Sequence, residues 1–272
     1  MQMVAAQLQK PFAVLQPDGF EEQMSEWLQR TNPDAVFVTA LSLKIPDSIL
    51  SPPRLGFLNF HSGPLPAYRG PQPVFWQIRN RETSLGLTIH QMTDELDRGA
   101  IHRIESAPLE PTDTFGTANY KLSPLALNAA KALLDDFARD NRIEFTPQAD
   151  SLAAFQAAPT PKDILIDWAT QSAEEIERIA RAANPTFMGA LFSLKGAPAY
   201  VPQATPSTLS NGDKTPGTVV ECSQDSGIIV QCAENTAVRL DLISTDRGVF
   251  TGARAIEIFG VKPNEILQTQ PL

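Results

Sequence analysis

The residues best suited to chemistry are Asn59 and His61, which stand two apart in the stretch NFHSGPLPAYRGPQP. They lie at the end of the apolar run LGFLN, residues 55–59, which is typical of a buried strand. Side chains two apart on a strand point the same way, so both can enter one cleft. An amide N–H and an imidazole N–H both donate well to a developing oxyanion, and histidine exchanges protons near neutral pH. The spacing favours an oxyanion-stabilising site, although an isolated Asn-x-His is often structural.

The loop after His61 is stiff. Its prolines restrict φ, and its glycines permit backbone shapes that are closed to other residues. Such a loop suits a preorganised site, although an ordinary rigid crossover has the same composition. Arg69 could anchor a carboxylate or a phosphate, or pair with one of the many acidic residues. The prolines and glycines are Gly63, Pro64, Pro66, Gly70, Pro71 and Pro73.

A third group is expected to orient the imidazole. The best candidate is Asp97, in the stretch MTDELDRGAI, because a carboxylate near His61 would favour the imidazolium. An Asp close to a Gly is also a common turn residue. His90 lies in a strand-like stretch, where it either packs in the core or forms a wall of the substrate cleft.

The elements that must position these groups alternate along the chain. Apolar runs at 35–41, 55–59 and 87–92 predict strands, the first of them buried on both faces. The stretches 20–31, 74–79 and 115–139 predict helices, with Asp18 as a candidate N-cap of the first. This order favours an α/β domain with an open, mostly parallel, Rossmann-like sheet. In such sheets ligands bind beyond the carboxyl ends of the strands, where Asn59 lies.

The second half has a different character. Ser172 and Glu175 form a capping box that opens a helix to about Ala183. From Pro216 the runs TVVEC, GIIVQC, AVRLDLI and ARAIEIF predict short strands of a small OB-like barrel or antiparallel sheet. We therefore expect a catalytic domain at 1–145, a linker at 146–163 and a β-barrel domain at 164–272.

Composition excludes several classes of protein. The 272-residue chain has a net charge of −9, and residues 160–272 hold 9 Lys+Arg against 13 Asp+Glu, a charge of −4. Phosphate contacts supply most nucleic-acid affinity, so this balance disfavours RNA as a main partner. No apolar stretch of about 18 residues predicts a membrane span. Two cysteines, Cys222 and Cys232, read as reduced thiols of a cytoplasmic protein, and three histidines without ligand spacing predict no metal site.

Taken together, these motifs resemble the folate-dependent formyltransferase family. The similar features, in order, are Asn59 and His61, LPAYRG at 65–70, Pro73 with Trp76, GLT at 86–88 and LDRG at 96–99. The later part is similar to the appended barrel domain of the family, through IDW at 166–168, the helix containing Arg178 and Arg181, and PGT at 216–218. The resemblance covers most of the chain.

The resemblance implies transfer of a formyl group from N10-formyltetrahydrofolate to a primary amine. Asn59 and protonated His61 would stabilise the oxyanion, and Asp97 would keep His61 charged and relay protons. It also implies a folate pocket at Leu41, Leu43, Lys44, Ile45, Asp94, Glu95 and Leu96. Candidate acceptor-binding residues are Pro64, Tyr68, Arg69 and His90.

The chain also departs from the family pattern. Family members open with a strand, a glycine-bearing turn, a helix and a second strand before the segment matched by residues 14–17, so we expect an N-terminally incomplete catalytic domain. Gly63-Pro64 replaces the Ser-Leu that is usual in the tRNA enzymes, and the appended domain is acidic.

Four activities stay open at this point. The first is formylation of a small or carrier-bound amine. The second is methionyl-tRNA formylation, which the acidic charge disfavours. The third is a non-catalytic folate-binding module, and the fourth is a hydrolase that uses water as the acceptor.

Overall fold

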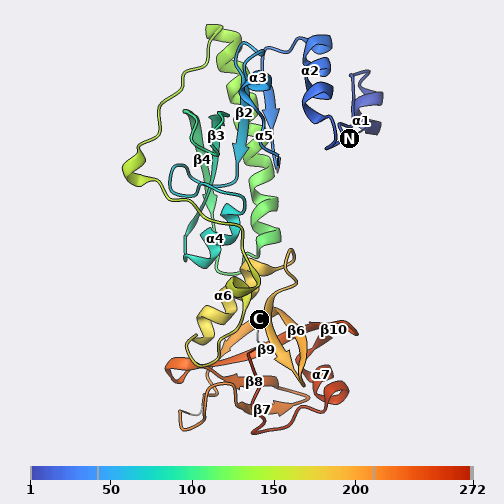
Figure 1. The fold of residues 1–272 in the computed structure, drawn as a ribbon. Helices are drawn as coiled ribbons and strands as arrows, with labels where there is room; N and C mark the ends of the chain where they lie inside the picture. Colours follow the sequence, from blue (N-terminus) through green and yellow to red (C-terminus); the bar gives the residue numbers. More distant parts are fainter. Residues whose placement is uncertain (1, 42, 211, 270–272) are drawn as a thin grey trace.

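The computed structural model describes residues 2–41, 43–210 and 212–269. Figure 1 shows an α/β part that holds strands β1–β4 and a β-rich part that holds strands β5–β10, with helices α4 and α6 between them. The elements of the first part are α1 (Gln2–Gln7), α2 (Phe20–Thr31), β1 (Val36–Val38), α3 (Asp47–Leu50), β2 (Phe57–His61), α4 (Pro73–Arg79), β3 (Ser84–Gln91), β4 (Ile101–Pro108) and α5 (Phe115–Asp140).

The first sheet has the order β1-β2-β3-β4 and is mixed. β1 and β2 pair in parallel, as expected, whereas β3 and β4 add antiparallel to β2 and to each other. β1 is the outer strand, and Phe37 on it is 40% exposed, so the expected burial of this strand on both faces is wrong. An outer strand has a neighbour on one side only, which leaves part of it open.

Alternation along β2 divides the interior into two cores. Leu58 and Phe60 join the large core that includes residues of α4 and α5. Phe57 points the other way, into a smaller core with Leu28 and Ile49 beneath α2 and α3. Asn59 and His61 continue on the face of Phe57, so the apolar side of the strand anchors it and leaves two polar side chains on the other side.

Several helix predictions are confirmed. α2 has the predicted limits, but Gly19, with φ of 72°, stands at its N-cap, so the assignment of this position to Asp18 is wrong. α5 extends the predicted 115–139 by one residue and begins with a Thr114–Thr117 capping box. The capping box of Ser172 and Glu175 opens α6 (Ala173–Ala183), as predicted. None of the helices in the described ranges is long and apolar enough to span a membrane.

The second part is an antiparallel sheet that closes on itself. Its strands have the order β5-β6-β9-β8-β7, with β10 paired to β9. The segment 264–268 joins the two outer strands: the Val219 N–H donates to the Glu265 carbonyl at 2.8 Å, and the Ser193 N–H donates to the Gln268 carbonyl at 2.9 Å. This closure gives the expected barrel-like domain. Its strands are β5 (Ala190–Leu194), β6 (Ala197–Ser207), β7 (Val219–Ser223), β8 (Gly227–Gln231), β9 (Ala237–Thr245) and β10 (Gly248–Thr251).

One predicted strand of this part is wrong. The run ARAIEIF forms helix α7 (Gly252–Phe259). The Thr251 hydroxyl caps its first turn by accepting from the Arg254 N–H, and Gly260, with φ of 63°, ends it. Ala255 and Phe259 recur at helical spacing, which competes with the alternating pattern that suggested a strand. In the described ranges, short 3₁₀ helices also lie at Asp150–Leu152, Pro161–Ile164 and Ala233–Asn235.

The two cysteines are free thiols, as expected. Cys222 lies opposite Ile228, and not opposite Cys232, across the β7–β8 hairpin. Cys232 is buried, and burial raises the pKa of its thiol to about 12. A thiol that resists ionisation is a poor nucleophile, so Cys232 has a packing role.

Candidate active site

Strand register brings the polar residues together. Asn59 lies opposite His90, and His61 lies opposite Thr88, across the β2–β3 pair. Leu87 and Ile89 of β3 enter the large core, so Thr88 and His90 face the other side, with Asn59 and His61. His90 is 1% exposed, and its ring contacts the Asn59 amide nitrogen at 3.2 Å.

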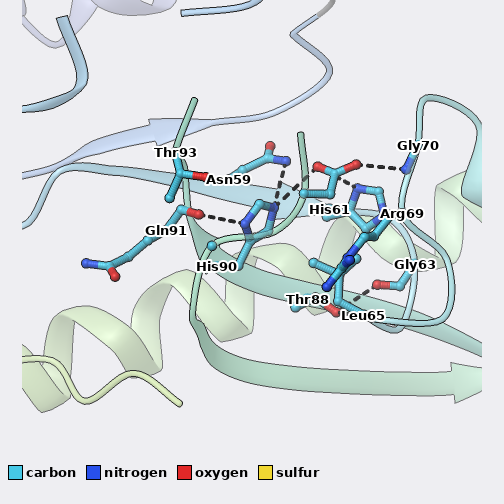
Figure 2. A network of polar contacts seen from close by, with 12 residues as sticks. Asn59, His61, Gly63, Leu65, Arg69, Gly70, Thr88, His90, Gln91 and Thr93 are labelled. Carbon is cyan, nitrogen blue, oxygen red and sulfur yellow. Dashed lines mark hydrogen bonds and ion pairs between the residues drawn. The ribbon is translucent and has the colours of Figure 1, made fainter. Parts of the chain in front are cut away.

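Asp97 completes this group from the loop between β3 and β4. Its Oδ1 lies 3.7 Å from His61 Nδ1 and 3.5 Å from His90 Nε2. Figure 2 shows the two imidazoles, from neighbouring strands, turned toward one carboxylate whose other oxygen faces Gly70. Asn59, His61 and Asp97, which the sequence singled out separately, therefore meet in one place, together with His90.

Main-chain carbonyls set the proton positions on both rings. His61 Nε2 lies 2.6 Å from the Tyr68 carbonyl oxygen, and His90 Nδ1 lies 2.8 Å from that of Gln91. A carbonyl can only accept, so each of these nitrogens carries a hydrogen. The other nitrogen of each ring faces Asp97. An added proton is therefore held between Asp97 and either imidazole.

The Asp97 carboxylate is held in place by its surroundings. Asp97 has a positive φ of 54°, and its Oδ2 accepts from the Gly70 N–H at 2.8 Å. Burial alone would raise the pKa of Asp97, but the interactions with His90 and His61 when these rings are protonated, and the Gly70 N–H, together bring this pKa below its ordinary value. Asp97 is therefore an anion at neutral pH.

The pKa of His61 differs from expectation. Burial lowers it below the ordinary 6.5, and this effect exceeds the opposing effects of Asp97 and of the hydrogen bond to Tyr68. The carboxylate acts in the expected direction, but desolvation has the larger effect. His61 is therefore a neutral imidazole at neutral pH in this structure, and not the imidazolium that the sequence suggested.

This pKa predicts a pH dependence of stability. The folded chain resists protonating His61, whereas the unfolded chain accepts a proton near 6.5. The contribution of His61 to the free energy of unfolding is therefore fully present above pH 6.5. It is lost as the pH falls from there toward the lower pKa of the folded state. Urea unfolding at pH values from about 7.5 to about 5 should show this loss, and His61→Gln should reduce its slope. The contribution of Asp97 is lost only below its ordinary pKa of 3.8, which is outside the pH range of this measurement. Equal slopes in the two proteins would contradict the assignment.

The loop 62–72 is held over β3 by two side chains, Thr88 and Gln77, to which the sequence analysis assigned no role. The Thr88 hydroxyl donates to the Gly63 carbonyl at 2.7 Å and accepts from the Leu65 N–H at 3.1 Å. Gln77 of α4 donates to the Ser62 carbonyl at 2.9 Å. These contacts connect residues that lie far apart in the chain, and no local pattern marks them.

Arg69 is buried and already engaged. Its guanidinium donates to Gln148 Oε1 at 2.8 and 3.0 Å and lies 3.4 Å from Asp150. Gln148 in turn donates to the carbonyls of Asp97 and Gly99, each at 2.8 Å. Arg69 therefore positions the loop of Asp97. Gln148 belongs to the segment that composition marked as a linker, and it was missed for that reason.

The other candidate residues have mixed surroundings. Ile45 is buried, and Tyr68 is buried with its hydroxyl donating to Glu82 at 2.5 Å. Pro64 is half-buried against Gly86, where a Cβ would lie only 2.6 Å from the proline. The remaining candidates for the folate pocket, all exposed, are Leu41, Leu43, Lys44, Asp94, Glu95 and Leu96.

Two other observations bear on what the site could hold. In the described ranges no three His, Cys, Asp or Glu side chains form a set that could hold a metal ion. A hollow of about 320 Å³, lined by residues that include Phe37, Leu55 and Leu134, lies beside β1 and α5. The ring of Phe37 contacts Phe60, which points away from Asn59, so this hollow is on the opposite side of the sheet from the polar group.

The fold and this group define an α/β domain with a buried Asn–His–Asp centre, followed by a closed β domain. Residues 3–131 match the formyl transferase family, and residues 159–255 match the formyl transferase C-terminal domain. The chain belongs to the formyltransferase family.

Curated relatives agree with this. A methionyl-tRNA formyltransferase of Pseudoalteromonas translucida is 35% identical over 180 residues, which are 65% of this chain and 55% of the relative. One of Syntrophus aciditrophicus is 36% identical over 172 residues, which are 61% of this chain and 52% of the relative. The chain therefore spans about half the length of these relatives.

Solved structures show the same fold. Crystal structures of HypX from Aquifex aeolicus include one in complex with tetrahydrofolic acid, with a TM-score of 0.67 and 20% identity, which covers 92% of this chain and 45% of HypX. WlaRD, a sugar 3N-formyl transferase, has a TM-score of 0.59 and 16% identity, and covers 74% of this chain and 70% of its own. At these identities the likeness concerns the fold alone.

Proposed function

We propose that this chain transfers a formyl group from N10-formyltetrahydrofolate to a primary amine on a small or carrier-bound acceptor. The observation that carries the proposal is the position of Asp97 between His61 and His90, with the Asn59 amide beside them. Membership of the formyltransferase family supports the reaction type. The same fold occurs in HypX, which has been solved in complex with tetrahydrofolic acid, and this supports a folate as the donor.

The reaction needs a hydrogen-bond donor and a route for one proton. The amine nitrogen bonds to the formyl carbon and loses a proton, and N10 of the folate takes up a proton as its bond to that carbon breaks. The Asn59 amide nitrogen has two N–H groups, so its contact with His90 leaves one for the charge that develops on the formyl oxygen. This donor would act without reorganising the site.

His61 and Asp97 can handle the proton. As a neutral imidazole, His61 can accept it at Nδ1, the nitrogen that faces Asp97. The carboxylate then stabilises the imidazolium until the proton is returned to the folate nitrogen. Asp97 thus acts on the reaction through His61. Its contacts with the Gly70 N–H and with His90 hold the carboxylate in its orientation.

The donor would lie next to the same row of strands. Val38, Asn59 and His90 are neighbours across β1, β2 and β3, and the segment formed by Leu41 and residues 43–45 follows β1. Together with the exposed residues 94–96 it offers backbone groups to a pterin ring. We assign the folate to these two segments.

The second candidate acceptor is a methionyl-tRNA. The curated relatives at 35% and 36% identity favour it. The charge of −4 over residues 160–272 disfavours it, because tRNA affinity depends on basic side chains. Tight, steeply salt-dependent tRNA binding would decide for this acceptor.

The first test is calorimetric titration of the chain with 5-formyltetrahydrofolate, a stable analogue of the donor. We expect saturable one-to-one binding, which Asn59→Ala retains because the pocket assigned to the folate lies in other segments. Turnover is then measured with a panel of amino sugars, aminoacyl carriers and methionyl-tRNA. A folded chain that binds no folate would refute the proposal. Folate binding without turnover would indicate a non-catalytic module, and formate release without amine would indicate a hydrolase.

A further inference from the structure

Three arginines gather where the two parts of the chain meet. Arg79 ends α4, Arg81 follows it, and Arg178 lies on α6, which packs against α4. Burial, and then the positive charges of Arg81 and Arg79, lower the pKa of Arg178 against the opposing charges of Glu175 and Glu177, so the three cations lie close enough to influence one another. Like charges repel, so such a group needs a partner.

In the part of the chain that the structure describes, no carboxylate pairs with them directly, although the charges of Glu175, Glu177 and Asp163 act on Arg79 or Arg178 from further away. None of the three side chains makes an ion pair or a side-chain hydrogen bond there, although the chain has 31 Asp+Glu for 22 Lys+Arg. The Nε atoms of Arg79 and Arg178 are buried without a hydrogen-bond partner. The guanidinium groups of Arg79 and Arg178 are thus partly buried and unsatisfied, whereas Arg81 is exposed.

The nearest carboxylates are engaged elsewhere. Glu175 accepts from the Ser172 N–H at 3.0 Å in the capping box of α6. Glu177 pairs with Arg181. Asp163 accepts from the backbone N–H and the hydroxyl of Thr160, each at 2.7 Å. These acids therefore offset part of the arginine charge from a distance, but their oxygens are engaged at a helix end or with a different arginine, and none forms an ion pair with Arg79, Arg81 or Arg178.

The backbone of Arg81 adds an independent observation. Arg81 has φ of 63°, in the left-handed region that glycine adopts without strain. An arginine at the end of α4 therefore strains the backbone in a way that a glycine would not. Strain of this kind is often found at ligand-binding positions, where the side chain is needed.

We propose that Arg79, Arg81 and Arg178 form a binding site for a phosphoryl group of a small phosphate ester. Guanidinium forks match phosphate oxygens in pairs, and three cations suit a dianion better than a single carboxylate. The site is near the polar centre but shares no residue with it. Tyr68 connects the two places. Its carbonyl faces His61, and its hydroxyl forms hydrogen bonds with Asn80 and Glu82, the residues on either side of Arg81.

A small ligand fits the surroundings better than a nucleic acid. Glu82 is exposed beside Arg81, and Glu174 is exposed on α6, so the cluster is bordered by acids. A phosphate backbone would have to pass these carboxylates, whereas a single phosphoryl group would not.

The test is calorimetric titration of the chain at constant ionic strength with inorganic phosphate, phenyl phosphate and citrate, without folate. We expect saturable binding of phenyl phosphate, weaker binding of inorganic phosphate and none of citrate. Arg178→Gln and Arg81→Gly should each weaken phenyl phosphate binding at least about tenfold. Because Arg81→Gly relieves the backbone strain, it should raise the midpoint of urea unfolding while it weakens the binding of phenyl phosphate.

Arg247→Gln is the matched control, because Arg247 is exposed on the distant β9–β10 hairpin and loses the same charge. It should bind phenyl phosphate as the unchanged chain does. Three results would overturn the proposal: no saturable phosphate binding, equal weakening by Arg247→Gln, or equal affinity for citrate. A short single-stranded RNA that binds while phenyl phosphate does not would replace it with a nucleic-acid site. None of these results involves formyl transfer, so they leave the proposed function unaffected.

Discussion

Replacing His61 by alanine should lower kcat by about 10²–10³-fold while 5-formyltetrahydrofolate still binds. The imidazole is buried, its Nε2 is directed by the Tyr68 carbonyl, and its Nδ1 faces Asp97 at 3.7 Å. It therefore supplies a proton acceptor whose position is set before the substrate arrives. Single-turnover measurement of formyl transfer, next to calorimetric folate titration, separates loss of chemistry from loss of binding.

The same experiment extends to the two neighbours of His61. Asn59→Ala should lower the rate by a similar factor, because it removes the amide donor. Asp97→Asn should lower the pKa of His61 further and depress turnover without abolishing folate binding, because the amide cannot stabilise an imidazolium. A pH–rate profile of Asp97→Asn reports this change, which a merely structural role would not produce.

His102 provides the matched control. It lies on β4, where its ring contacts Phe145 and its Nδ1 contacts the Glu144 carbonyl, away from the polar group. His102→Ala should leave kcat within a small factor of the unchanged chain. Unchanged rates in the Asn59, His61 and Asp97 variants would remove the site assignment altogether.

Replacing Gly70 by alanine should destabilise the fold by roughly 3 kcal/mol or more. Gly70 has φ of 118°, and a Cβ there would lie 2.0 Å from the backbone oxygen of Gln156. That oxygen cannot move freely, because the Gln156 N–H donates to the Arg69 carbonyl at 2.7 Å. The alanine would push apart the loop 62–72 and the segment 154–156.

Gly196 separates the two causes of this effect. It also has a positive φ, of 81°, but no atom lies within 4 Å of its hypothetical Cβ. Gly196→Ala should therefore cost only the backbone strain, about 1–2 kcal/mol. Urea unfolding of both variants gives the difference. If Gly70→Ala costs no more than Gly196→Ala, the close contact with Gln156 does not exist in solution.

Gly70→Ala should also impair catalysis beyond its effect on folding. The Gly70 N–H donates to Asp97 Oδ2 at 2.8 Å, so a shift of the loop removes one of the contacts that orient the carboxylate. Turnover should fall even under conditions where the variant is fully folded. Full activity in the folded variant would show that Asp97 does not depend on this loop.

Predictions from the sequence were most successful where local patterns carry the information. The limits of α2, the capping box of α6 and the closed β part follow from hydrophobic period and capping residues. Asn59 and His61 are two apart on a strand, so their common direction follows from strand geometry. The run that forms α7 was misread because a short apolar segment fits both periods.

His90 shows where sequence reasoning stopped short. Its alternation with Leu87 and Ile89 was visible, and it places His90 on the polar side of β3. The sequence left core packing and a wall of the cleft both open, because the partner of β3 could not be read from the chain. The pairing of Asn59 with His90 exists only once the register of β2 and β3 is set.

The sequence by itself determined the family, the two-part organisation of elements and the identity of the three central residues. Only the tertiary structure decided the protonation of His61, the engagement of Arg69 by Gln148 and the gathering of Arg79, Arg81 and Arg178. The physical reason is that period, capping and turn chemistry act over a few residues. Desolvation and charge pairing depend on which distant segments come to lie around a group.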